Sequence, residues 1–175
     1  MRQTRELILK EADEWDAKPL AKLLACVTQE TDFVVQDSLV SWDEADLAPY
    51  LADSKTQINS LCLLALLEDE AIGLITIVGG KSLSLSHIGD VFIAVKKNYW
   101  GLGIAQALLE MAIDWAEHSG VIRRLELSVQ ARNSVAIHIY KKYGFEIEGI
   151  KKRGAREACG HFLDVYMMAK LIEGK

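Results

Sequence analysis

The stretch from residue 84 to residue 118 constrains the fold of this chain more than any other part of the sequence. Residues 84–95 are predicted to form a strand that is apolar on both sides, since Val91, Ile93 and Val95 alternate with further apolar residues. A strand of that kind belongs in the middle of a sheet, where both faces are covered. A short polar turn, two glycines and an amphipathic helix over residues 103–118 follow directly. The chain is therefore predicted to be a mixed α/β (α+β) domain.

The remaining elements follow from hydrophobic periodicity and from helix-terminating residues. Asp13 is predicted to cap the first helix, and the S-x-x-E spacing of Ser41 and Glu44 predicts a capping box for the second. Gly120 and Gly144 stand where left-handed C-terminal caps are expected. The predicted order is strand 6–10, helices 15–27 and 41–53, strands 61–67, 71–78 and 84–95, helix 103–118, strand 125–129, a helix from 133 to 144, and closing strands 146–154 and 161–169.

Length and charge limit what this protein can be. The sequence has 175 residues and contains no linker, repeat or low-complexity run, so a single domain over residues 1–175 is expected. A net charge of −5 argues against general nucleic-acid binding, which needs a surplus of Lys and Arg on one face. The basic run at Lys151, Lys152, Arg153 and Arg156 could contact phosphates or a partner, but such short runs are more often a solvated strand edge.

The cysteines and the N-terminus bear on the compartment. The three cysteines have no C-x-x-C spacing, which fits neither a disulfide framework nor a zinc site, so a reducing cytoplasm and no metal are expected. Cys26 and Cys62 lie in apolar stretches and are predicted to be buried, whereas Cys159 is predicted to be exposed. The N-terminal residues lack the apolar region of a signal peptide, and no stretch reaches the about 18 apolar residues of a membrane helix. We therefore expect a soluble, cytoplasmic protein without membrane contact.

The turn Trp100-Gly101-Leu102-Gly103-Ile104-Ala105 at the start of a helix is typical of an anion site. Glycines let the backbone approach a ligand, and the uncovered N–H groups of the first helical turn can hold a pyrophosphate. The simpler interpretation is a tight connection between a strand and a helix. Neither a P-loop nor a dinucleotide fingerprint is complete, because there is no Gly-Lys-Ser/Thr and no third glycine with a distal acidic residue.

With this turn and the stretch 127–145, the sequence resembles the GCN5-related N-acetyltransferase (GNAT) superfamily over nearly its whole length. In that family an Arg/Gln-x-x-Gly-x-Gly/Ala turn binds the pyrophosphate of coenzyme A, and the present turn matches at Gly103 and Ala105 but has Trp100 at the first position. The resemblance implies a central, largely antiparallel sheet that is splayed at the acetyl-CoA site, with helices on both faces. The coenzyme-binding residues that it implies are Ile93, Ala94, Val95, Trp100, Gly101, Leu102, Gly103, Ile104, Ala105, Gln106, Asn133 and Tyr140.

The stretch from Leu127 to Phe145 resembles the family's succession of strand, Asn, helix, Tyr and Gly-Phe. The resemblance places Asn133 at the pantetheine arm or the catalytic centre and Tyr140 near the thioester sulfur, as the general acid that protonates the leaving thiolate. Each residue also has a plainly structural interpretation, because Asn is among the best helix caps and a Tyr can simply pack in a core.

The implied reaction is direct transfer of an acetyl group from acetyl-CoA to a primary amine of a small molecule or a protein N-terminus. Backbone N–H groups near Ile93, Ala94 and Val95 would stabilise the developing oxyanion. His87 and Asp90 on the preceding strand, and Glu30 or Asp32 between the first two helices, are candidate bases.

Acceptor recognition is expected in the segments 29–39 and 151–161, with Glu30, Asp32 and Phe33 as candidate substrate contacts. A homodimer is compatible with such a domain. Two alternatives stay open at this point, namely a non-catalytic acyl-CoA-binding or regulatory module on the same fold and a protein-interaction domain without coenzyme.

Overall fold

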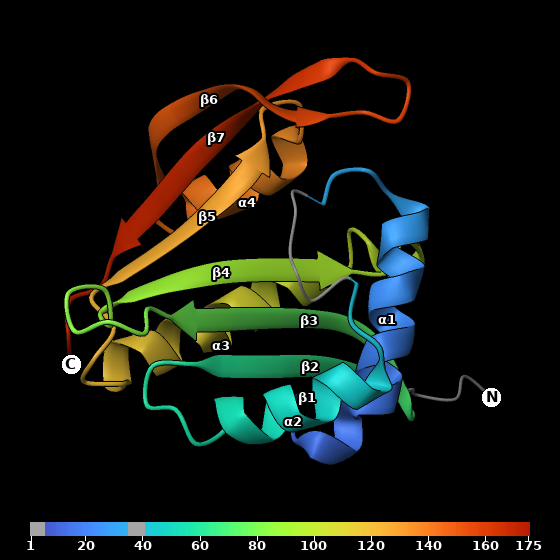
Figure 1. Ribbon diagram of the computed structural model, residues 1–175, viewed down its shortest axis with the longest axis vertical. Coiled ribbons are helices and arrows are strands. Elements are labelled where there is room, and N and C mark those ends of the chain that lie inside the picture. The colour runs from blue at the N-terminus through green and yellow to red at the C-terminus, as the bar shows by residue number, and fades with distance from the viewer. Residues whose placement is uncertain (1–5, 35–40) are drawn as a thin grey trace.

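The computed structural model describes residues 6–34 and 41–175, which form one seven-stranded sheet with helices on both faces (Figure 1). The strands lie in the order β1-β2-β3-β4-β5-β7-β6. In chain order the elements are β1 (Leu7–Glu11), the 3-10 turn η1 (Glu14–Asp16), α1 (Ala17–Glu30), α2 (Glu44–Ser54), β2 (Leu61–Leu67), β3 (Glu70–Gly79), β4 (Ile88–Val95), the 3-10 turn η3 (Lys97–Tyr99), α3 (Ile104–His118), β5 (Arg124–Gln130), α4 (Ser134–Lys142), β6 (Glu146–Arg156) and β7 (Phe162–Leu171).

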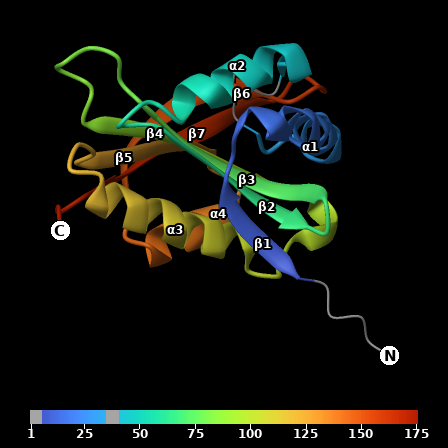
Figure 2. The same ribbon diagram turned by 90° about the horizontal axis from the view of Figure 1, so that it is seen from below.

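The centre of the sheet is covered on both sides. In β2, Leu61, Leu63 and Ala65 face one core, whereas Cys62 and Leu64 face the other, as the period of two along a strand requires. The first core is completed by α3 and α4, and the second by α1 and α2, so that each pair of helices covers one face of the sheet (Figure 2). The predicted mixed α/β fold with helices on both faces is confirmed.

The pairing between β4 and β5 ends early. These two strands run parallel and pair at three positions only, from Ile88↔Arg124 to Asp90↔Glu126. The rest of β4 is paired with β3, as far as Gly73↔Val95, but has no recorded partner on β5 among the described residues. The two strands diverge from this point (Figure 1). The expected splay in a largely antiparallel sheet is therefore present, and it exposes one edge of residues 91–95.

Two predicted helix starts are wrong by a few residues. Asp13 caps the short turn η1 rather than the helix itself, which begins at Ala17 and continues to Glu30. The second capping box is formed by Asp43 and Asp46, whose carboxylates each accept a hydrogen bond from the other's backbone N–H, and not by Ser41 and Glu44. Asp is as good an N-cap as Ser, and the spacing of three residues recurs two positions later.

The strand predicted from Ser84 begins only at Ile88. Residues 81–87 form turns instead, because the N–H of Leu85 bonds the carbonyl of Ser82 and the N–H of Ile88 bonds the carbonyl of Leu85. His87 consequently lies in a loop, outside β4.

Cys62 is buried and Cys159 is exposed, as predicted, whereas Cys26, which was predicted to be buried, is only half-buried. None of the helices within residues 6–34 and 41–175 is long and apolar enough to cross a membrane.

Candidate active site

The turn before α3 is built from backbone. Gly101 and Gly103 adopt left-handed conformations, with φ of +75° and +81°, which residues other than glycine rarely adopt. A Cβ added to either glycine would meet no atom within 4 Å, so the backbone here faces open space. Gly103 is the N-cap of α3 and offers no side chain to the N–H groups of the first turn, which have no partner inside a helix. The local geometry fits a phosphate-bearing ligand.

Basic and amide side chains flank this turn. Lys142 of α4 donates a hydrogen bond to Oε1 of Gln106, 3.0 Å away, in the first turn of α3. That first turn carries no acidic residue. The positive end of the helix dipole and the Lys142 ammonium therefore act together on an anion placed at this end of α3.

Trp100 has a structural role that the sequence did not predict. Its indole Nε1 donates to the carbonyl oxygen of Val95 at 2.7 Å and so closes the connection from β4 to α3. The indole ring also lies 6.4 Å, centre to centre, from the ring of Phe33. The departure from Arg or Gln at this position therefore exchanges a polar side chain for one that braces the loop.

Asn133 and Tyr140 lie at the start and near the end of α4. Oδ1 of Asn133 accepts a hydrogen bond of 3.2 Å from the N–H of Ala136, so its role as a helix cap is confirmed. Tyr140 is 8% exposed and packs against Phe145, with the ring centres 5.9 Å apart. Burial raises the pKa of the Tyr140 phenol, which keeps its proton on the oxygen throughout the neutral range.

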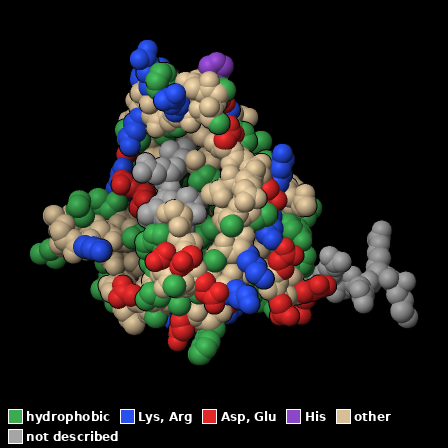
Figure 3. Space-filling model, turned by 45° about the vertical axis from the view of Figure 1, so that its right-hand side comes forward, with side chains coloured by type: hydrophobic (Ala, Val, Ile, Leu, Met, Phe, Trp, Pro, Cys, Tyr) green, Lys and Arg blue, Asp and Glu red, His purple; other side chains and the backbone are tan. Residues whose placement is uncertain are grey.

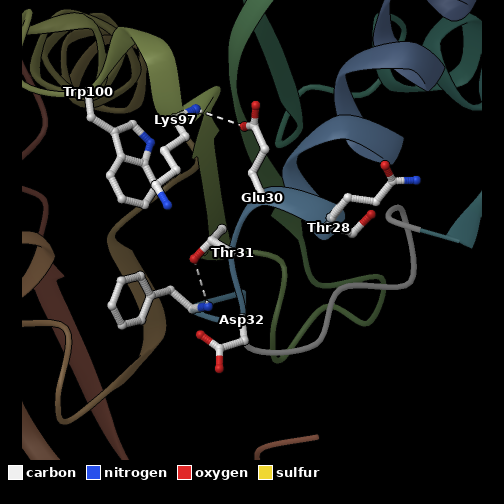
Figure 4. Close-up of a pocket in the computed structure, with 8 residues that line it drawn as sticks. Thr28, Glu30, Thr31, Asp32, Lys97 and Trp100 are labelled. Carbon is white, nitrogen blue, oxygen red and sulfur yellow. Dashed lines mark hydrogen bonds between the residues drawn. The ribbon is translucent and has the colours of Figure 1, made fainter.

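The end of α1 contacts the chain just beyond β4. Glu30 is the last residue of α1, not a loop residue, and its Oε2 accepts a 2.8 Å hydrogen bond from the backbone N–H of Lys97 (Figure 4). This bond lowers the pKa of Glu30, so the carboxylate stays ionised. The carboxylate therefore holds the turn after β4 and is a poor candidate for the base.

The next residues of the same segment contact the chain just beyond β5. Asp32 forms a 2.9 Å ion pair with Arg132, which lowers the pKa of the carboxyl group, and its carbonyl accepts a 2.5 Å hydrogen bond from Nε2 of Gln130. The Arg132 guanidinium also lies 5.2 Å from the centre of the Phe33 ring. Residues 30–33 therefore reach from the end of β4 to the end of β5, across the mouth of the splay. They border a pocket of about 440 Å³ together with Thr28, Lys97 and Trp100 (Figure 4).

Arg132 and Gln130 were missed by sequence reasoning. Arg132 bonds Oε1 of Gln130, pairs with Asp32 and forms a further ion pair with Glu157 at the tip of the β6–β7 hairpin. The one signal in the sequence is a polar Gln at the end of an apolar strand, and Gln130 proves to be 2% exposed. The remainder of the predicted acceptor segment, from residue 35 to residue 39, lies outside the described residues.

The two candidate bases on the β4 side lie differently. His87 is exposed in the loop before β4, and about 17 Å of strand separates Ile88 from Ile93 at the usual rise per residue. Asp90 is in β4 itself, at the last position paired with β5. Of the two, only Asp90 borders the splay.

Charged side chains are unevenly distributed over the face of the molecule that Figure 3 shows. Lys and Arg side chains gather at the end formed by the β6–β7 hairpin, whereas many Asp and Glu side chains lie toward α1 and α2 (Figure 3). On the hairpin, Glu157, Cys159 and His161 bring possible metal ligands within 4.8 Å of one another. Glu157 is already paired with Arg132, and the other two are exposed, so we assign no metal to this group.

The sequence profile of the acetyltransferase (GNAT) family matches residues 27–145, which include the α3 turn, Asn133 and Tyr140. The chain belongs to the GNAT family. This acetyltransferase is 36% identical over 109 residues to the L-amino acid N-acetyltransferase AaaT of Escherichia coli, a match that covers 62% of the chain and 67% of that protein. It is 30% identical over 103 residues to a streptothricin acetyltransferase of Escherichia coli, covering 58% of the chain and 56% of that protein.

Solved structures of the family have the same fold as this GNAT protein. A GNAT acetyltransferase from Streptococcus pneumoniae superposes with a TM-score of 0.91 at 42% identity, covering 95% of this chain and all of that one. An acetyltransferase from Salmonella typhimurium, solved with its cofactor acetyl-CoA, superposes with a TM-score of 0.83 at 15% identity, covering 97% and 95% of the two chains. The second likeness shows the fold alone.

Proposed function

We propose that this GNAT protein is an acetyl-CoA-dependent N-acetyltransferase that transfers an acetyl group directly to a primary amine of a small molecule or a protein N-terminus. The observation that carries the proposal is the open edge of β4 over residues 91–95, which ends at the glycine turn of α3. Named acceptors among the relatives range from L-amino acids to streptothricin and spermidine, so likeness alone selects none of them.

The coenzyme site would combine two backbone surfaces. The N–H groups at Gly103, Ile104, Ala105 and Gln106 would hold the pyrophosphate. The backbone of Ile93, Ala94 and Val95 is not paired with β5, and it would bind the pantetheine amides and the acetyl oxygen. When bound, acetyl-CoA supplies an activated acyl group as a thioester.

Tyr140 would act as the general acid. A buried phenol with a raised pKa is protonated at neutral pH, which a proton donor to a leaving thiolate requires. Because Oδ1 of Asn133 caps α4, its contact with the coenzyme would be made by the N–H groups of its side-chain amide. Asp90 is the better placed of the two predicted bases on the β4 side, since it borders the splay.

The proposal is tested by incubating the protein with acetyl-CoA and a panel of amines and following the release of free thiol. Tyr140→Phe keeps the ring packed against Phe145 and removes only the hydroxyl. We expect kcat to fall about 100-fold, as usual when a general acid is lost, with the Kd for acetyl-CoA nearly unchanged. Tyr99→Phe removes the same hydroxyl group from a tyrosine in η3, outside the proposed reacting centre. It is the matched control and should keep normal turnover.

One outcome would contradict the proposed activity, and another would contradict only the role proposed for Tyr140. Thermal stabilisation by acetyl-CoA without turnover on any amine would favour the non-catalytic acyl-CoA-binding module. An unchanged kcat in Tyr140→Phe would remove this residue from the mechanism.

A further inference from the structure

A second and larger pocket, of about 990 Å³, lies between α2 and the face of β3 and β4. We call it the α2 pocket. Its lining residues are Trp42, Tyr50, Asp53, Ser54, Gln57, Ile58, Asn59, Ser60, Thr76, Val78, Gly79, Gly80, Lys81, Ser86, Asp90, Phe92 and Val121. Its volume is at the upper end of the range for sites that enclose small molecules.

The floor of the α2 pocket is a four-residue patch of sheet. Thr76 of β3 is paired with Phe92 of β4, and Val78 is paired with Asp90. Directly paired residues of antiparallel strands project to the same face, so these side chains form one surface that joins a hydroxyl, a ring and a carboxylate. Asp90 is also the last residue of β4 that pairs with β5, and Phe92 precedes Ile93. The floor therefore adjoins the β4 segment proposed to hold the acetyl group.

The far end of the α2 pocket is held in place by specific contacts. Nδ2 of Asn59 donates to the carbonyl oxygens of Gly80, at 3.2 Å, and of Ser86, at 3.0 Å. A side chain at Gly79 would overlap Asn59, and one at Gly80 would overlap the backbone of Leu85. The loop after β3 is thus fixed by close backbone approach, which makes this wall rigid.

Thr76 carries a buried hydroxyl group in the floor of the α2 pocket. The residue is 1% exposed, and its Oγ1 has no hydrogen-bond partner among the described residues. Leaving a buried hydroxyl unpaired is destabilising, and Val would have filled the same space without that cost. A polar group retained at such a place in the floor of a pocket is explained if a ligand supplies its partner.

The charges and rings of the α2 pocket indicate the kind of ligand. Asp53 and Asp90 contribute two carboxylates, whereas Lys81 contributes one ammonium group, so the lining favours a cation. Trp42 and Tyr50 meet edge to face with their ring centres 5.2 Å apart, and aromatic walls suit both apolar groups and cations.

We infer that the α2 pocket holds the body of the acceptor, and that the acceptor is a small cationic amine without a carboxylate, with Thr76 as a specificity-determining hydrogen-bond partner. This inference rests on the proposed acetyltransferase activity and names its substrate class. A protein N-terminus followed by a folded chain fits a pocket of this size less well than a compact amine does.

Matched pairs of acceptors test the charge preference. Agmatine against L-arginine and tyramine against L-tyrosine differ by one carboxylate, and a tripeptide with a free N-terminus represents protein acceptors. We expect kcat/KM for each amine to exceed that for its amino acid by at least about tenfold, the effect of about 1.4 kcal/mol. Equal or greater activity on the amino acids or the tripeptide would overturn the assignment of substrate class.

Thr76→Val and Thr76→Ser test the hydroxyl. Thr76→Val should raise KM for the preferred amine about fivefold, leave KM for acetyl-CoA unchanged and raise Tm, because a buried unpaired hydroxyl is gone. Thr76→Ser should restore KM. The control Thr56→Val removes an exposed hydroxyl that already bonds the carbonyl of Asp53 at 2.8 Å, so it should leave KM unchanged and not raise Tm. An unchanged acceptor KM together with a lowered Tm in Thr76→Val would show a purely structural threonine.

Turnover and thermal stabilisation together distinguish a failure of this inference from a failure of the proposed function. Turnover of any amine in the panel by the unaltered protein supports the acetyltransferase, whatever the effect of Thr76→Val. Where no amine is turned over, thermal stabilisation by agmatine or tyramine that Thr76→Val weakens still supports the α2 pocket as an amine site. The absence of such stabilisation would then overturn it.

Discussion

The turn before α3 and the α2 pocket differ in what they are made of. At the turn, two glycines in left-handed conformations and the bare N-terminus of a helix present backbone groups to a ligand. In the α2 pocket, side chains from α2, from Trp42 just before it, and from β3 and β4 supply the hydroxyl, the rings and the carboxylates. Backbone sites depend on conformation and side-chain sites on residue identity, so one fold can keep its coenzyme while its acceptor changes.

Among the tests that distinguish the turn from the α2 pocket, a substitution that blocks only the backbone site gives the largest expected effect. Gly103→Val imposes a branched side chain on a left-handed residue and directs it into the open space in front of α3. We expect affinity for acetyl-CoA to fall at least tenfold, measured by calorimetric titration. Gly120→Val is the matched control, since Gly120 has φ of +72° and open space at the other end of the same helix.

Both glycine variants should lose similar stability, about 1–2 kcal/mol, from the left-handed backbone. Only Gly103→Val should lose the coenzyme. Equal affinity for acetyl-CoA in the two variants would show that the turn is a connection and not a site.

A substitution at the mouth of the splay tests a further set of side chains, which lies outside both the turn and the α2 pocket. Arg132→Ala removes the ion pairs to Asp32 and Glu157 that join residues 30–33 to the β6–β7 hairpin. We expect kcat/KM for the amine to fall about tenfold, because the segment is no longer held by these charge-assisted bonds, with KM for acetyl-CoA nearly unchanged.

Arg124→Ala serves as its control, because Arg124 starts β5, the strand that Arg132 follows, and pairs with Glu126 and Glu148 at the closed end of the splay. Kinetic constants of this variant should match those of the unaltered protein. A loss of coenzyme affinity in Arg132→Ala would mean that the two halves of the site are coupled.

The smallest expected effect concerns the stability contributed by Tyr140, the proposed general acid. Burial raises its pKa above the ordinary value near 10, so the folded state holds the phenolic proton more tightly than the unfolded state. The stability that this contributes is complete below about pH 10 and is lost as pH rises above it, by up to about 1.4 kcal/mol per pH unit. Urea unfolding at pH 9 and pH 11 should therefore show a larger loss for the unaltered protein than for Tyr140→Phe. Identical losses would indicate a solvated phenol.

Within residues 6–34 and 41–175, the order of the strands and α-helices was predicted correctly, because each depends on neighbours a few residues away. Gly103, Gly120 and Gly144 were recognisable for the same reason, and all three adopt positive φ. Where two local patterns competed, the prediction failed, as when Asp43 capped α2 in place of Ser41. Local periodicity also could not show that the loop held by Asn59 delays the start of β4.

The acceptor side was predictable only in part. Glu30, Asp32 and Phe33 were placed near the site by resemblance, but their contacts to Lys97 and Arg132 join segments up to about a hundred residues apart. The hydrogen bond from Gln130 to Asp32 spans 98 positions. Pairings at such separations depend on topology, which no local pattern reports. The buried hydroxyl of Thr76 is likewise indistinguishable, in sequence, from any threonine in a strand.

The outer strand β6 has a consequence for the protein in concentrated solution. It is the last strand of the sheet, and its pairing with β7 is interrupted by register shifts near Gly149 and between Lys151 and Ala155. Charged side chains follow one another along its exposed residues, from Glu146 and Glu148 to Lys151, Lys152 and Arg153. A twisted, charged edge resists the addition of another strand, so β6 protects a large, otherwise open sheet against edge-to-edge aggregation.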